Sequence, residues 1–157
     1  MRWLILAAIL LFIAAQVSRM RPSKRDQQLQ ALRQVATRAG LTVRFWTARN
    51  SGYRLRQLPE SGYQYLLPRR LQGDAEPVWA LWLDSDGRIT PLGGQPPELA
   101  YQWLEAFHGR FHEPWALLES CQAGLGLVWQ ERGTPEDVTN ICEALQLLRQ
   151  NLDALPG

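Results

Sequence analysis

The sequence contains few of the residues that usually form covalent cross-links and metal sites. It has two cysteines, Cys121 and Cys142, and two histidines, His108 and His112, among 157 residues. These numbers exclude a disulfide framework and a cysteine-based zinc site built from one copy of the chain. No spacing of Ser, His and Asp suggests a nucleophile motif, and the glycine pairs lack a nucleotide-binding pattern. The sequence therefore predicts no enzyme, no cofactor and no metal.

The composition is nevertheless that of a folded protein. Apolar residues make up 46% of the chain and charged residues 20%, and seven tryptophans supply bulky core material. This content excludes a disordered or low-complexity chain. The length fits one ordinary domain and leaves little room for a second.

One long apolar run begins the chain, from Trp3 to Ala15. A helix from Met1 to about Met20 would rise roughly 30 Å, which suits a bilayer core. The cations that follow favour the cytoplasmic side of the membrane. We therefore predict a single-pass anchor in the inner (cytoplasmic) membrane, with the C-terminal domain in the cytoplasm. The residues assigned to this anchor are Trp3, Leu4, Ile5, Leu6, Ile9, Leu10, Leu11, Phe12 and Ile13.

A cleaved signal peptide is the alternative interpretation of the same run, with a passable cleavage site at Ile13-Ala14-Ala15. The basic flank argues against it, because positive charge after the run resists export.

Charge is divided unequally along the chain. Through Arg70 there are thirteen basic and two acidic residues, a net charge of +11, whereas the remainder carries −9. Cations next to an anchor attract anionic lipid head groups. The sequence therefore predicts lipid contact by Arg19, Arg21, Lys24 and Arg25.

A nucleic-acid or ribosome contact is an alternative use of the basic half. Cations there alternate with aromatic residues, as a base-stacking surface requires. The residues concerned are Arg44, Arg49, Arg54 and Arg56, with Phe45, Trp46 and Tyr53.

The order of elements predicts an α+β domain. Ser23 and Asp26 form a capping-box pattern for a helix that ends before Gly40, and Thr134 caps a final amphipathic helix. Alternating or apolar segments predict an antiparallel meander sheet, with about three helices in all. The segments are 41–47, 53–58, 63–67, 78–83 and 88–91, followed by a hairpin of 116–119 with 125–130. The predicted organisation is a transmembrane anchor (1–20), a basic juxtamembrane helix (21–40) and a cytoplasmic domain (41–157).

Two short patterns could indicate metal chemistry. His108 and His112 lie four residues apart with Glu113 next, and a small metal-dependent enzyme using them is a further alternative. Asp84-Ser85-Asp86-Gly87 has part of a calcium-loop pattern, but a hairpin turn accounts for these residues.

The N-terminal quarter also resembles a known family. The residues that carry the likeness are Arg21-Pro22-Ser23-Lys24-Arg25, Gln27-Gln28-Leu29, Leu32 and Gly40-Leu41-Thr42-Val43. Residues 3–45 resemble YajC-like preprotein translocase accessory subunits. The resemblance implies a single span, a cytoplasmic C-terminal portion and contact with the secretion channel, and it implies no catalytic residues.

These observations predict a noncatalytic single-pass inner-membrane protein. Its cytoplasmic domain would act as an accessory of protein translocation or of another membrane complex, with membrane lipids as further partners.

Overall fold

The computed structural model describes residues 3, 9, 11–13, 23–48, 53, 58–68, 78–111 and 113–154. The chain divides into two compact units, Met1–Ala31 and Leu32–Gly157. The boundary falls within helix α2 (Lys24–Arg38). In the first unit, the Ser23 backbone N–H donates to the Asp26 carboxylate at 3.0 Å, and the Asp26 N–H donates to the Ser23 hydroxyl at 3.1 Å. The predicted capping box is therefore confirmed.

The predicted membrane anchor needs correction. Within the residues that the structure describes, no helix has both the length and the apolar character needed to cross a bilayer. The strictly apolar run has thirteen residues, fewer than the roughly 20 that a span requires. This finding contradicts the transmembrane helix in the predicted fold class and the single-pass inner-membrane location with it. Leu4, Ile5, Leu6 and Leu10 lie outside the described residues.

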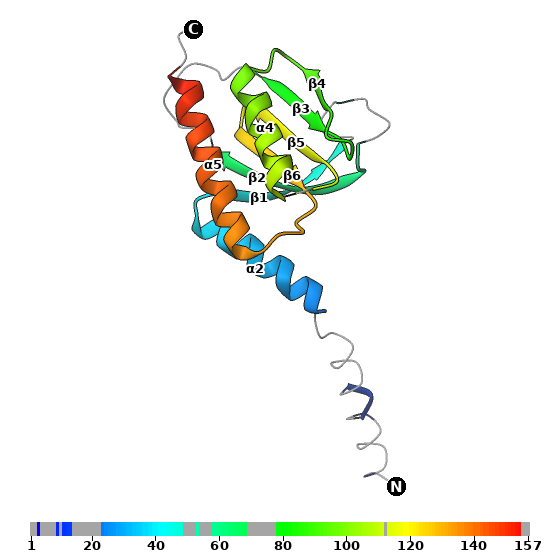
Figure 1. Ribbon diagram of the computed structural model, residues 1–157. Helices are drawn as coiled ribbons and strands as arrows, with labels where there is room; N and C mark the ends of the chain where they lie inside the picture. The colour runs from blue at the N-terminus through cyan, green and yellow to red at the C-terminus, as the bar shows by residue number, and fades with distance from the viewer. Residues whose placement is uncertain are drawn as a thin grey trace. The chain divides into compact units, whose positions relative to one another are not determined.

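The second unit is built on one six-stranded antiparallel sheet (Figure 1). Its strand order is β1-β2-β6-β5-β3-β4. The strands are β1 (Thr42–Thr47), β2 (Ser61–Pro68), β3 (Trp79–Leu83), β4 (Ile89–Gly93), β5 (Ala116–Cys121) and β6 (Gly124–Trp129). The predicted hairpin is confirmed as β5 and β6.

The predicted meander is wrong in its order. The hairpin of β5 and β6 lies between β2 and β3, so β2 pairs with β6 and β3 pairs with β5. All residues of β3, β5 and β6 except Cys121 are buried, and this burial accounts for their near-continuous apolar sequences. The predicted strand at 53–58 falls mostly outside the described residues.

Helices α4 (Glu98–Phe111) and α5 (Pro135–Asp153) cover one side of the sheet, which we call the helix face (Figure 1). The Phe107 ring of α4 packs edge to face against the Trp129 ring of β6, with ring centroids 6.3 Å apart. The Trp103 indole N–H donates to the Ala144 carbonyl of α5 at 3.1 Å, which joins the two helices. The predicted Thr134 cap of α5 is confirmed, with Pro135 in the first turn.

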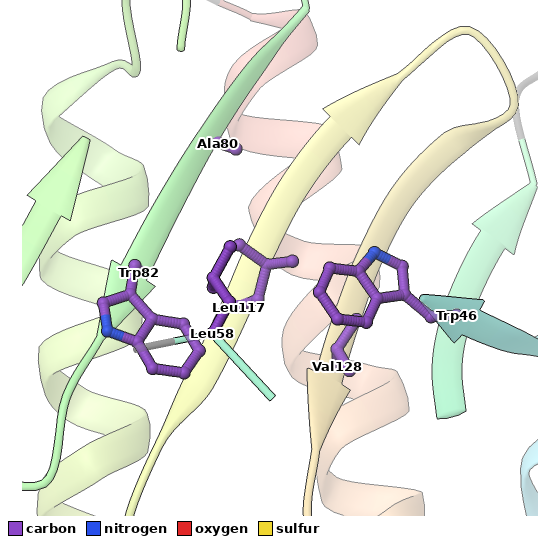
Figure 2. Packing of buried hydrophobic residues seen from close by; sticks show 6 residues of the cluster. All are labelled: Trp46, Leu58, Ala80, Trp82, Leu117 and Val128. Carbon is purple, nitrogen blue, oxygen red and sulfur yellow. The ribbon is translucent and has the colours of Figure 1, made fainter. Parts of the chain in front are cut away.

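The opposite side of the sheet, which we call the tryptophan face, holds a separate apolar cluster. Figure 2 shows this cluster on the side of the strands away from the helices. Trp115 stacks on Trp82, with ring centroids 5.6 Å apart. Side chains alternate along a strand, and strands β1, β3, β5 and β6 each contribute buried residues to this cluster. The cluster consists of Trp46, Leu58, Ala80, Trp82, Leu117 and Val128.

Candidate functional site: an edge strand and a buried polar row

The two edge strands of the sheet differ in their outward backbone groups. In the turn that leads into β4, the Asp84 N–H donates to the Arg88 carbonyl at 3.0 Å. Backbone groups of antiparallel strands point alternately toward and away from the partner, so the Pro91 nitrogen faces away from β3. Proline has no N–H, and a register irregularity follows at Ala80 and Leu81 of β3. Both features protect an edge against pairing with another strand.

Strand β1 lacks this protection. The Ala48 N–H donates to the Glu60 carbonyl at 3.2 Å. The same alternation directs the backbone N–H and C=O groups of Val43 and Phe45 away from β2. The strand contains no proline, and β2 is its only partner among the strands that the structure describes. We call this outer side of β1 the β1 edge.

An aromatic side chain accompanies the β1 edge on the helix face. Phe45 is 62% exposed, although it belongs to the sheet. Its ring packs edge to face against the Tyr63 ring of β2, with ring centroids 5.6 Å apart. The Arg33 guanidinium covers the Tyr63 ring, 3.5 Å from its centroid. Phe45 therefore rests on a fixed support while remaining accessible to solvent.

On the tryptophan face, a chain of polar side chains runs inward from β1. We call Arg44, Gln64, Glu119 and Tyr53 the polar row. Arg44 Nε donates to Gln64 Oε1, and Gln64 Nε2 donates to Glu119 Oε1. The Tyr53 hydroxyl donates to Glu119 Oε2 at 3.1 Å. Arg44 is exposed, whereas Gln64 is 0% and Glu119 5% exposed.

A glycine makes room for the row. Gly126 of β6 lies opposite Glu119 of β5 and two residues before Val128, which is opposite Gln64. A Cβ on Gly126 would lie 2.7 Å from Gln64 Cδ and would also overlap Gln64 Nε2. The Gln64 side chain can cross β6 to reach Glu119 because no side chain stands at position 126.

The polar row has a defined electrostatic character. Burial raises the pKa of Glu119, and this rise is opposed by the Tyr53 hydrogen bond, the Arg44 charge and the Gln64 hydrogen bond. Burial also raises the pKa of Tyr53, with a further contribution from Glu119. The row therefore satisfies a buried carboxyl group with donors and holds the Arg44 side chain at the sheet edge.

A second polar group joins α2 to the segment after β6. Arg33 donates to the Glu131 carboxylate through Nε at 2.9 Å and Nη2 at 2.7 Å. The Tyr65 hydroxyl donates to the same carboxylate at 2.8 Å. Glu131 has a positive φ of 56°. The two bonds from Arg33 to Glu131 hold the part of α2 after Ala31 beside the sheet and support the Arg33 position over Tyr63.

The histidine site raised as an alternative falls only partly within the described residues. No group of three His, Cys, Asp or Glu residues able to hold a metal occurs among the described residues, and His112 lies outside them. His108 instead packs against the turn of Asp84 and Gly87, where the Asp84 carboxylate accepts the Asp86 and Arg88 N–H groups, each at 2.9 Å. The predicted hairpin turn is confirmed.

The stacking surface of the nucleic-acid alternative is not formed as predicted. Trp46 is 6% exposed and belongs to the core cluster, whereas Phe45 faces the other side of the sheet. Tyr53 bonds to Glu119. Arg49, Arg54 and Arg56 lie outside the described residues.

The predicted lipid contacts fall on the first unit. Lys24 and Arg25 are exposed in the first turn of α2. Arg19 and Arg21 lie outside the described residues. Lipid contact by these four cations stays a prediction.

Two surface hollows are lined by described residues. One, between α4 and α5 beside Trp103 and Arg110, has a volume of about 140 Å³. The other, beside Pro68 and Arg149, has about 250 Å³. Both are smaller than the roughly 300–1,000 Å³ typical of small-molecule sites.

Sequence patterns alone did not single out Gln64 or Glu119, and they indicated Gly126 only as part of a hairpin. Each carries a local signal, because a polar residue or a glycine interrupts an otherwise apolar strand. Comparisons with protein-family models, curated proteins and solved structures find no match to this chain. The resemblance of residues 3–45 to YajC-like subunits therefore stays a prediction.

Proposed function

We propose that residues 32–157 form a noncatalytic interaction domain that receives an extended segment of a partner protein at the β1 edge. One observation carries the proposal: β1 directs the backbone groups of Val43 and Phe45 outward, whereas β4 places Pro91 at the other edge. An unprotected edge is a template for strand addition, and proteins normally block such edges.

The surroundings of the β1 edge support this role. Main-chain hydrogen bonds to an added strand supply affinity, and neighbouring side chains supply specificity. Phe45 offers an exposed aromatic surface, and its contact with Tyr63 limits the ordering that binding would require.

Two of the buried carboxyl groups, those of Glu119 and Glu131, support a noncatalytic role because both are hydrogen-bonded within the fold. Glu119 accepts hydrogen bonds from Gln64 and Tyr53, and Glu131 accepts them from Arg33 and Tyr65. These partners come from other parts of the fold, so the acidic groups act as internal cross-links. An accessory role in protein translocation, or in another membrane complex, remains compatible with such a domain and stays a prediction from the N-terminal resemblance.

Site-specific crosslinking tests the proposal. A photo-crosslinking amino acid replaces Phe45 in the full-length protein, and separately replaces Ile89 of β4 as the matched position. We expect position 45 to give a reproducible adduct with one segment of a partner. Val43→Pro should abolish this adduct because it removes an outward N–H, whereas Ile89→Pro, which removes an outward N–H from β4, should leave it intact.

Amide hydrogen exchange then separates strand addition from mere proximity. A synthetic peptide of the crosslinked segment should slow exchange of the Val43 and Phe45 amides and leave that of Ile89 unchanged. Thermal unfolding of Val43→Pro confirms that the variant is folded. Absence of an adduct at position 45, or an adduct that Val43→Pro does not reduce, would overturn the proposal.

A further inference from the structure

The position of Arg44 limits which segments can bind well at the β1 edge, if β1 receives an added strand as proposed above. A residue of the added strand directly opposite Arg44 would project on the tryptophan face beside the guanidinium. Residues on either side of it would project on the helix face, beside Val43 and Phe45. A segment that is complementary to the β1 edge therefore carries a charged residue on the tryptophan face and apolar residues on the helix face.

Arg44 is held in place before binding. Its Nε donates to Gln64, and its Nη2 lies 3.7 Å from Cys121 Sγ. Gln64 is in turn held by Glu119, and Glu119 by Tyr53. The guanidinium has five N–H donors in a rigid plane, so these contacts leave donor groups of an exposed cation for a ligand. Restricting this long side chain in advance reduces the ordering cost of a new ion pair.

The charge of this region favours an acidic ligand. β1 contains no acidic residue, and Arg44 is its one charged residue. Glu119, the carboxyl group of the row, is buried on β5 and separated from Arg44 by Gln64. A second copy of β1 is a poorer ligand, because a pairing centred on Arg44 would place two arginines opposite each other.

We propose that the β1 edge selects an extended segment in which acidic residues alternate with apolar ones, with one acidic side chain beside Arg44. The acidic residue pairs with the guanidinium on the tryptophan face. The apolar residues cover Val43 and Phe45 on the helix face.

Two synthetic peptides test this selectivity with the full-length protein. One alternates valine and glutamate over seven residues between terminal glycines, and its twin has lysine in place of the central glutamate. Chemical-shift titration measures the Kd of each, and amide exchange reports on Val43 and Phe45. We expect the acidic peptide to bind about three- to tenfold more tightly, the size of one favourable cross-strand charge pair replaced by a repulsive one.

Substitutions at Arg44 supply the controls. Arg44→Gln should make the two affinities equal, and Arg44→Glu should reverse the preference. Equal protection of Val43 and Phe45 by both peptides in the wild-type protein would overturn the acidic selectivity while leaving strand addition standing. Protection by neither peptide would contradict both proposals. Protection that rises with protein concentration alone would identify a second copy as the occupant and overturn the acidic ligand.

Discussion

Glu119 is a buried carboxyl group whose environment changes its affinity for a proton. It is 5% exposed, and burial raises its pKa above the ordinary value of 4.5. The folded protein therefore binds this proton more tightly than the unfolded chain does. The resulting stabilisation is fully present below about pH 4.5 and is lost as the pH rises through the folded-state pKa.

A Glu119→Gln variant tests the direction in which stability changes with pH. We expect the wild-type free energy of unfolding to fall relative to the variant as the pH rises above 4.5, because the variant cannot ionise there. Tyr53→Phe should extend to higher pH the range over which this stability is lost, since the Tyr53 hydrogen bond lowers the pKa of Glu119. Urea unfolding at several pH values measures both effects. A difference between wild type and Glu119→Gln that does not change with pH would contradict the assignment.

Gly126 is the second residue with a sharp expectation. Gly126→Ala should destabilise the fold by about 1–3 kcal/mol, because the new methyl group overlaps the buried Gln64 side chain. Gly109→Ala is the matched control, since its Cβ meets nothing within 4 Å. As Gly109 lies in α4, we expect this control to stabilise by roughly 0.5–1 kcal/mol.

The pair of Gly126 and Gln64 can be separated by a double-mutant cycle. In a Gln64→Ala background, Gly126→Ala should cost less, because the side chain that it overlaps is absent. Chemical unfolding of the four proteins measures the coupling. Additive effects would show that the cost at position 126 has another origin.

Whether a side-chain hydrogen bond could be predicted depends on how far apart its two residues lie in the sequence. The caps at Ser23 and Thr134 were predicted because each depends on residues three positions apart. The polar row joins residues 20 and 55 positions apart. The Gln64–Glu119 bond crosses β6, which lies between β2 and β5, so no local pattern contains it.

Among the elements, the positions of the strands in the sequence were easier to predict than the order of the strands in the sheet. The alternating or apolar patterns located β1, β2 and β3, and the glycines at 124 and 126 marked the β5–β6 hairpin. The order was not predictable, because β3, β5 and β6 are buried on both faces. Apolar strands of this kind pack equally well beside several partners.

Helix α2 carries two of the four cations predicted to contact lipid, Lys24 and Arg25. We expect the full-length protein to bind vesicles of anionic lipid in a way that weakens with salt. Alanine at Arg21, Lys24 and Arg25 should reduce this binding, whereas Arg38→Ala, at the other end of α2, should reduce it less. Vesicle co-sedimentation provides the measurement. Binding that is absent, or unaffected by salt, would remove lipid from the partners.

At the scale of the whole molecule, the unit boundary within α2 predicts unequal stability along one helix. Residues before Leu32 belong to the first unit, and Lys24–Gln28 are exposed. Leu32 and Ala36 are fully buried, and Arg33 bonds to Glu131 at 2.7 Å. Local opening is easiest where few side chains are buried. The first half of α2 should therefore open without unfolding of the sheet.

Hydrogen exchange along α2 tests this prediction. We expect amides after Leu32 to exchange only on unfolding of the second unit, and amides before it at least about tenfold faster. Ser23→Ala should speed exchange in the first half alone, because it removes the cap. Arg33→Met should speed exchange in the second half, because it breaks the ion pair with Glu131. Uniform protection along α2 would contradict the boundary, since one cooperative unit would then hold the entire helix.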